Sequence, residues 1–306
     1  MTRSERKRLR SGIGFTSLWI VGLAAFTAYP VVASLYYSFC DYSILKSPVW
    51  CGLENYHQLV RDDLFWKSLR NTLFYAGLSV PLGTVVALGL AVLLNCEVRG
   101  RSIYRLLFFM PSIVPAVASA MLWLWIFNGE YGLMNGFLNP ILAPFGLHAP
   151  TWLADPAWSK PALVIMSLWG TGNAMVIYLA GLQNVPGELY DAAAIDGASA
   201  WQRFCHVTLP VIAPVVAFNA IMAIISAMQL FAQAYIMSEA ANGNGNASDG
   251  NPARSTLFYT IYLFSTAFQD LRMGYASAMA YILFLVTALL TWMAARLSRS
   301  RHGDAI

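Results

Sequence analysis

Long charge-free runs of apolar residues recur along the chain and are separated by shorter polar segments. Each run exceeds the ~20 residues that a helix needs to cross the hydrocarbon core of a bilayer. The short alternating segments typical of a membrane β-barrel are absent from the sequence. The pattern therefore predicts an all-α integral membrane protein with six transmembrane helices, at residues 13–39, 72–95, 106–129, 161–187, 207–238 and 273–295.

Composition agrees with this prediction. Hydrophobic residues make up 58% of the 306 residues and charged residues only 11%. With this composition, a soluble protein of 306 residues would have too few polar residues to cover its surface. The interpretation of the apolar runs as core helices of a soluble protein is therefore disfavoured. A signal peptide is also disfavoured for the first run, because the run is too long for a signal-peptide core and lacks a clear small-residue cleavage site.

Basic residues cluster beside alternate ends of the predicted helices, which indicates the cytoplasmic side. They are Arg3, Arg6, Lys7, Arg8, Arg10, Arg99, Arg101, Arg105, Arg203, Arg296, Arg299 and Arg301. The first outer connection also holds Lys46, Arg61, Lys67 and Arg70, balanced by Asp41, Glu54, Asp62 and Asp63. We therefore expect a plasma-membrane protein with both termini cytoplasmic: a basic segment 1–12, a transmembrane domain 13–296 and a tail 297–306.

The net charge of +4 is explained by this topology and by contact with anionic membrane lipid, and it does not indicate nucleic-acid binding. Three connections are expected outside: an ordered surface segment at 40–70, a connection at 128–160 with a short interfacial helix, and a flexible loop at 242–250. Cys40 and Cys51 lie in the first of these. They form either a disulfide or, as we favour, two separate thiols.

Motifs that are missing from the sequence exclude several classes of function. The sequence has no phosphate-binding loop, no cluster with metal-ligand spacing, and no pairing of nucleophile and base. We therefore expect no enzyme activity, cofactor or metal in this chain. Ionisable residues occur only at the edges of the apolar runs, which disfavours an ion-coupled secondary carrier without excluding one that holds sodium with neutral oxygens.

The predicted cytoplasmic loop 184–210 has the pattern of two short helices joined at a glycine. Pro186 suits a first helical turn, Gly197 a left-handed end of the first helix, and Ser199 with Gln202 a capping box for the second. The loop also carries Leu189, Ile195, Trp201 and Phe204, which is more apolar surface than a solvated loop needs. Such a surface indicates a docking site for a partner, or alternatively a helix resting on lipid headgroups.

This loop resembles the cytoplasmic signature of binding-protein-dependent ABC importer permeases. That signature reads Glu-Ala-Ala, three residues, Gly, nine residues, Ile, one residue, Leu-Pro. The chain matches it, with Asp for Glu and Val for Ile, at Asp191, Ala192, Ala193, Gly197, Val207, Leu209 and Pro210. In the family these residues couple the permease to its ATPase.

The resemblance extends from about residue 14 to residue 296 and favours the carbohydrate-uptake branch, specifically the larger-loop permease of maltose-type and glycerol-phosphate-type importers. The similar segments are Tyr29-Pro30, Gly52-Leu-Glu-Asn-Tyr56, Arg105-Leu-Leu-Phe-Phe-Met-Pro111, Ile195-Asp-Gly-Ala198 and Gly274-Tyr-Ala-Ser-Ala278. The resemblance implies the six-helix, MetI-like core of a type I importer. It also implies a second homologous permease, two copies of an ATPase subunit that bind ATP and Mg²⁺, and an extracytoplasmic solute-binding protein.

Candidate solute contacts lie in the fifth apolar run, where amides and aromatic rings suit sugar hydroxyls and C–H faces. They are Asn219, Gln229, Phe231, Gln233 and Tyr235. The same residues also suit packing between membrane helices. Pro210 and Pro214 are candidates for a hinge, or simply start the fifth helix. Because these residues carry no fixed charge, we expect a neutral sugar or oligosaccharide, with glycerol phosphate or another polyol as the alternative.

Overall fold

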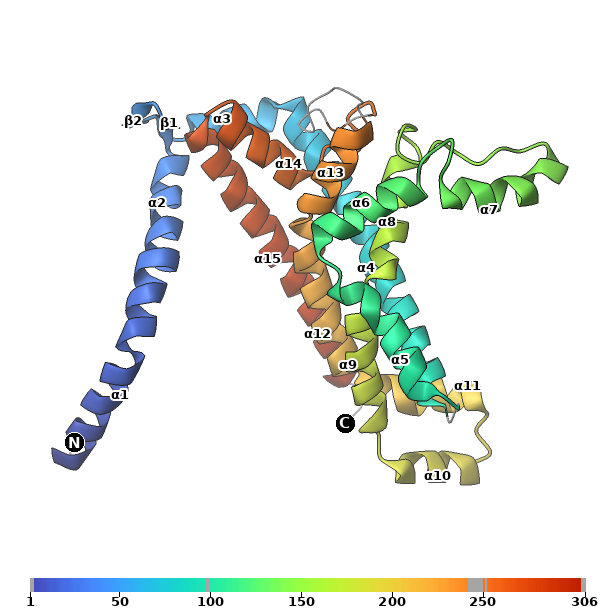
Figure 1. Cartoon of the computed structure of the whole chain (residues 1–306). Coiled ribbons are helices and arrows are strands. Elements are labelled where there is room, and N and C mark those ends of the chain that lie inside the picture. Colours follow the sequence, from blue (N-terminus) through green and yellow to red (C-terminus); the bar gives the residue numbers. More distant parts are fainter. Residues whose placement is uncertain (1–2, 97–98, 242–249, 251, 304–306) are drawn as a thin grey trace. The chain divides into compact units, whose positions relative to one another are not determined.

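The computed structural model describes residues 3–96, 99–241, 250 and 252–303, so most of the predicted loop 242–250 lies outside the described residues. The described part of the chain is mostly helical (Figure 1). Within the described residues, four helices are long and apolar enough to span a bilayer: Gly12–Ser38, Asp63–Asn95, Ala200–Met228 and Met273–Ser298. Two bent helix pairs, Arg101–Ile113 with Ala116–Ile126 and Ser159–Trp169 with Gly172–Gln183, bring the count to six if each pair is one span.

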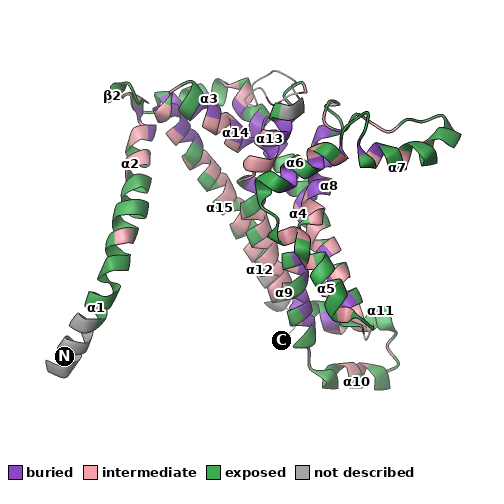
Figure 2. Cartoon of the chain, in the orientation of Figure 1, coloured by how far each residue is buried: buried purple, intermediate pink, exposed green. Residues whose placement is uncertain are grey.

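The chain divides into two compact units. The first contains residues up to 62 and residues 263–282. Its elements are α1 (Arg3–Leu23), the π-helical turn η1 (Ala24–Ala28), α2 (Tyr29–Ser38), β1 (Cys40–Ser43), β2 (Lys46–Trp50), α3 (Glu54–Arg61), the π-helical turn η6 (Ser265–Gln269) and the start of α15 (Met273–Gly303). The strands form an antiparallel hairpin. Figure 2 shows α1 and α2 exposed along most of their described length, as expected of a helix that meets lipid or another subunit.

Side chains of the segment 52–56 close the end of α2. Gly52 has a φ of 64°, in the left-handed region that glycine tolerates. The buried Asn55 amide donates to the carbonyl oxygens of Ser38 at 3.0 Å and Cys40 at 2.9 Å, which would otherwise lack partners beyond the helix end. The Tyr56 hydroxyl donates to Ser38 Oγ at 2.9 Å. The first outer connection is thus ordered, as predicted.

The start of α15 fits against the end of α2 and the start of β1 only because residue 274 is glycine. A Cβ at Gly274 would lie 2.0 Å from the carbonyl oxygen of Cys40. The neighbouring Tyr275 hydroxyl donates to Asp62 Oδ2 at 2.6 Å. Cys40 and Cys51 are separate thiols in this arrangement. The Gly-Tyr pair of segment 274–278 therefore has a packing role in the first unit.

The second unit contains residues 63–262 and the end of the chain from residue 283. Its elements are α4 (Asp63–Asn95), α5 (Arg101–Phe109), the 3₁₀ turn η2 (Met110–Ile113), α6 (Ala116–Ile126), α7 (Leu133–Leu142), the 3₁₀ turn η3 (Ala143–Phe145), α8 (Ser159–Trp169), α9 (Gly172–Gln183), α10 (Gly187–Ile195), α11 (Ala200–Arg203), the π-helical turn η4 (Phe204–Thr208), α12 (Leu209–Met228), α13 (Ala232–Ala241) and α14 (Tyr259–Phe264), which continues into the first unit. α4 packs against α8, α9 and α12. The second predicted span thus begins earlier than expected, since Lys67 and Arg70 belong to α4 and not to the loop.

Three of the six predicted spans are interrupted in the structure. The third bends by 101° between η2 and α6, where Pro115 cannot donate a backbone hydrogen bond. The fourth bends by 49° at Gly170, the C-cap of α8. The fifth ends at Met228, and α13 begins only at Ala232. No glycine or proline lies in that last break, so the sequence gives no local sign of it.

Two further features position these helices. A Cβ at Gly172 would lie 2.2 Å from the carbonyl oxygen of Phe108, so the end of α5 can approach α9 only at a glycine. The third connection contains the predicted short helix, α7. Its buried Asn135 accepts a hydrogen bond from Trp152 Nε1 at 2.7 Å, which ties α7 to the chain that returns to α8.

Candidate functional site

The loop between α9 and α12 contains a helical elbow. α10 starts at Gly187, one residue after Pro186, and ends where Gly197 takes a φ of 76°. The amide of Gly197 donates to the carbonyl of Ala194 at 3.1 Å, and the amide of Ala198 donates to the carbonyl of Ala193 at 2.9 Å. These two bonds form a Schellman motif, in which a left-handed glycine satisfies the last carbonyls of a helix. The predicted glycine-terminated helix is confirmed.

The second arm of the elbow begins with the predicted capping box. Ser199 Oγ accepts from the Gln202 amide at 3.3 Å, and the Ser199 amide donates to Gln202 Oε1 at 2.8 Å. This arm is not a separate short helix as expected, because α11 continues through the π-helical turn η4 into α12. A wider turn just before Pro210 accommodates the ring and the missing donor of proline.

The continuous helix Ala200–Met228 makes the elbow mechanically part of the fifth span. The Tyr190 hydroxyl in α10 and Thr208 Oγ1 in η4 are 2.8 Å apart and hydrogen-bonded, which joins the two arms across the bend. α10 and α12 are therefore connected both along the chain and by this side-chain hydrogen bond.

The elbow presents apolar side chains to its surroundings. Ile195 is 87% exposed and Trp201 is 72% exposed, and Leu189 is also exposed. The Trp201 and Phe204 rings stack with centroids 5.6 Å apart. Of the signature residues, Asp191 and Ala192 are exposed on α10, whereas Val207, Leu209 and Pro210 lie in η4 and the start of α12. The predicted exposed apolar surface is confirmed.

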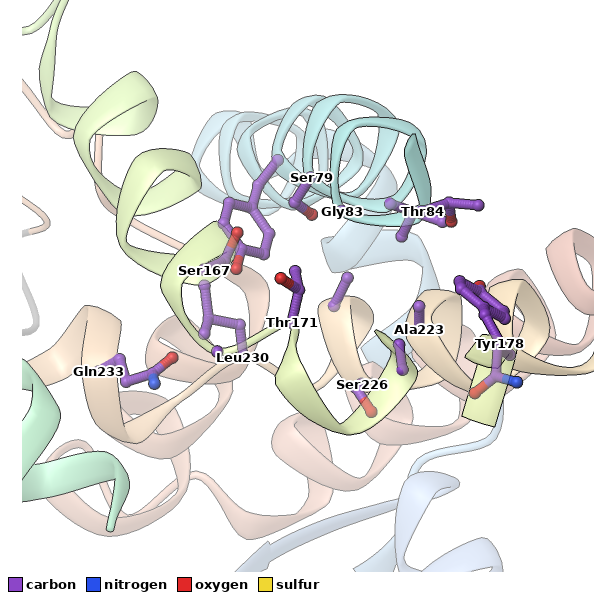
Figure 3. Close-up of a pocket in the computed structure, with 16 residues that line it drawn as sticks. Ser79, Gly83, Thr84, Ser167, Thr171, Tyr178, Ala223, Ser226, Leu230 and Gln233 are labelled. Carbon is purple, nitrogen blue, oxygen red and sulfur yellow. The ribbon is translucent and has the colours of Figure 1, made fainter. Parts of the chain in front are cut away.

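A second candidate site is a cavity of about 320 Å³ between α4, the α8–α9 bend and α12. Figure 3 shows Ser79 of α4 opposite Ser167 and Thr171 of the bend, with Ser226 and Gln233 on the third side. The Ser167 hydroxyl donates to the carbonyl of Val164, and the Thr171 hydroxyl donates to the carbonyl of Leu168. Their oxygen lone pairs can still accept hydrogen bonds from a solute.

No charged residue lines this cavity, among the residues that the structure describes. Two of the five predicted solute contacts, Asn219 and Gln233, lie in its lining. The other three do not: Gln229 caps the end of α12, and the rings of Phe231 and Tyr235 pack on each other and on the core.

The sequence matches the family described as binding-protein-dependent transport system inner membrane components, over residues 79–303. The chain belongs to this family. The permease is 39% identical over 293 residues to the probable ABC transporter permease protein YesP of Bacillus subtilis, covering 95% of this chain and 91% of that protein. It is 32% identical over 309 residues to the lactose transport system permease protein LacF of Rhizobium radiobacter, covering 98% of both.

A solved structure shows the same fold. A chain of a bacterial alginate ABC transporter, in complex with its alginate pentasaccharide-bound periplasmic protein, matches with a TM-score of 0.81 at 22% identity, over 97% of this permease and 96% of that chain. The family and the type I importer fold expected from the sequence are therefore confirmed. The alternative of an ion-coupled secondary carrier is set aside.

The cavity of this permease includes hydroxyl groups that the sequence analysis did not identify, most of them outside the fifth span. They belong to Tyr75, Ser79, Thr84, Ser167, Thr171, Tyr178 and Ser226. A signal was present: Tyr75, Ser79 and Gly83 recur every four residues, which places small and hydroxyl-bearing side chains on one face of α4. Among the described residues, no group of three His, Cys, Asp or Glu side chains could hold a metal ion.

Proposed function

We propose that this permease carries a neutral sugar or oligosaccharide across the plasma membrane through the cavity between α4, α8–α9 and α12. The observation that carries the proposal is a lining rich in hydroxyl and amide groups and free of charge in the described residues. Sugar hydroxyls exchange hydrogen bonds with such groups without desolvating an ion. The function of the lactose permease relative supports the same solute class.

In this proposal an extracytoplasmic binding protein delivers the solute, and a second homologous permease completes the pathway. Two ATPase subunits bind ATP and Mg²⁺ and hold the elbow formed by α10 and α11. The exposed Ile195 and Trp201 side chains support docking, because burying them in a partner removes apolar surface from water. Both termini and the elbow face the cytoplasm. Closure of the ATPases then moves the elbow, and the continuous helix through α12 changes access to the cavity.

The test compares two glutamines of the same segment. Gln233 lines the cavity and Gln229 does not. Loss of one solute hydrogen bond costs about 0.5–1.5 kcal/mol, so Gln233→Ala should raise the KM for uptake about 2- to 13-fold. Gln229→Ala is the control and should leave KM unchanged. The proposal would be contradicted if wild type and Gln233→Ala, assembled into importers at the same level, had equal KM values. The cavity would then not be part of the solute pathway.

An anionic solute, such as an acidic glycan or glycerol phosphate, is the second candidate. Lys160 supports it: its ammonium lies 3.2 Å from Asn71 Oδ1 and 4.9 Å from the centre of the Phe74 ring, with Lys67 and Arg70 near enough to repel it. Lys160 precedes the cavity residue Ser167 by about two turns of α8. Lys160→Gln should impair uptake of an anionic solute and spare a neutral one, so transport assays with both solutes decide between the candidates.

A further inference from the structure

The side of α5 that faces the protein begins with two arginines. Arg101, Arg105 and Phe109 are the half-buried residues of this helix, spaced four apart, and the six residues between them are exposed. With its amide oriented for hydrogen bonding, Gln183 at the end of α9 accepts from Nη2 of both guanidinium groups, at 2.8 Å each. Two like charges therefore converge on one neutral oxygen.

Neither arginine is neutralised within the part of the chain that the structure describes, which leaves out Glu97. Arg101 Nη2 also lies 3.5 Å from Asn95 Oδ1, another neutral acceptor at the end of α4. The Nε atoms of Arg101 and Arg105 are buried and have no hydrogen-bond partner. Buried donors normally have partners, so these Nε atoms are available to an acceptor from outside the described chain. An anion would supply the acceptor and reduce the repulsion.

The surroundings favour a lipid phosphate as this anion. Directly after Arg105, α5 and the start of η2 expose an apolar and charge-free face that includes Leu106, Leu107 and Met110. The acyl chains of a lipid would cover this apolar face. An acidic loop of a soluble subunit could pair with the arginines but would leave the apolar face uncovered. A guanidinium pair matches the oxygens of a phosphate group, and basic pockets between helices at the cytoplasmic side bind anionic headgroups.

We propose that Arg101 and Arg105 form a binding site for the headgroup phosphate of an anionic phospholipid, whose acyl chains lie along the exposed face of α5. The proposal rests on the cytoplasmic placement of the start of α5 given above. It does not depend on which solute is carried. The bound lipid would fix α5 to the ends of α4 and α9, next to the elbow, and would hold the cavity helices in register with it.

The experiment uses the assembled importer in nanodiscs of phosphatidylcholine with or without phosphatidylglycerol, followed by mild delipidation and native mass spectrometry. Each arginine near an anionic surface contributes enough to change binding about 5-fold, so Arg101→Gln with Arg105→Gln should lower retained phosphatidylglycerol about 30-fold. The control, Arg99→Gln with Arg296→Gln, removes the same charge from exposed positions and should retain the lipid. Arg101→Lys with Arg105→Lys keeps the charge, and should retain an intermediate amount.

Three results would overturn the proposal. One is equal retention of phosphatidylglycerol by the double Gln variant and its control. Another is retention of phosphatidylcholine as strong as that of phosphatidylglycerol in the wild type. The third is loss of the ATPase subunits from the double Gln variant with its lipid retained, which would assign the arginines to a protein contact. Because no solute is present, failure here is distinct from failure of the proposed sugar pathway.

Discussion

The conformation of Gly197 gives the sharpest test of the elbow. A Cβ at this position meets no atom within 4 Å, so a substitution acts through the backbone and not through a clash. The φ of 76° is the relevant constraint. Asn adopts this region most easily after Gly, Ala less easily, and a β-branched residue least. The series Gly197→Asn, Gly197→Ala and Gly197→Val therefore grades the strain without changing the neighbours.

The expected size follows from the cost of the left-handed region. For Ala this cost is roughly 1–2 kcal/mol. If the elbow must keep its bend to dock, Gly197→Ala should weaken association of the ATPase about 5- to 30-fold. Gly197→Val should weaken it further, and Gly197→Asn should lie closest to wild type. Gly187→Ala is the matched control, because it adds a methyl group in open space at the other end of α10.

The assay measures ATPase association with the purified permease pair, then solute-stimulated ATP hydrolysis and uptake by the reconstituted importer. Association, stimulation and uptake should fall together along the series. Wild-type uptake and stimulation in Gly197→Val would refute the coupling role. Equal impairment by Asn and Val would show that the residue acts through something other than its φ angle.

Three further predictions concern packing, a thiol and topology. Gly172→Ala should destabilise the purified permease by about 1–3 kcal/mol, since its methyl would meet the backbone of α5, whereas Gly89→Ala in open space should not lower the melting temperature. Burial, reinforced by nearby negative charge, raises the pKa of the Cys51 thiol. Its alkylation rate should therefore keep rising at pH values above those at which an ordinary thiol levels off. In a variant whose four native cysteines are replaced by serine, a membrane-impermeant maleimide added to intact cells should label Lys46→Cys and not Ser199→Cys. The reverse pattern would show that the topology is opposite to the one predicted.

The sequence alone was enough for the class of protein and for the local form of the elbow. Charge-free runs long enough to cross a bilayer can form only a few kinds of structure. Lipid offers no hydrogen-bond partners, so the backbone N–H and C=O groups have to bond to one another, as they do in a helix. The glycine end and the capping box depend on residues a few positions apart, and both formed as predicted. The family signature lies in this same locally encoded segment.

Tertiary structure decided where the helices break and which side chains share a cavity. No glycine or proline marks the end of α12 at Met228. The break that follows separates Gln233, which lines the cavity, from Gln229, which does not. The hydroxyls of Ser79, Ser167 and Thr171 come together only because α4 packs against the α8–α9 bend. Hydrophobic periodicity identifies an apolar face, but in a membrane nearly every face is apolar. Packing between helices, fixed by close approaches such as that at Gly172, therefore determines which polar groups line the pathway.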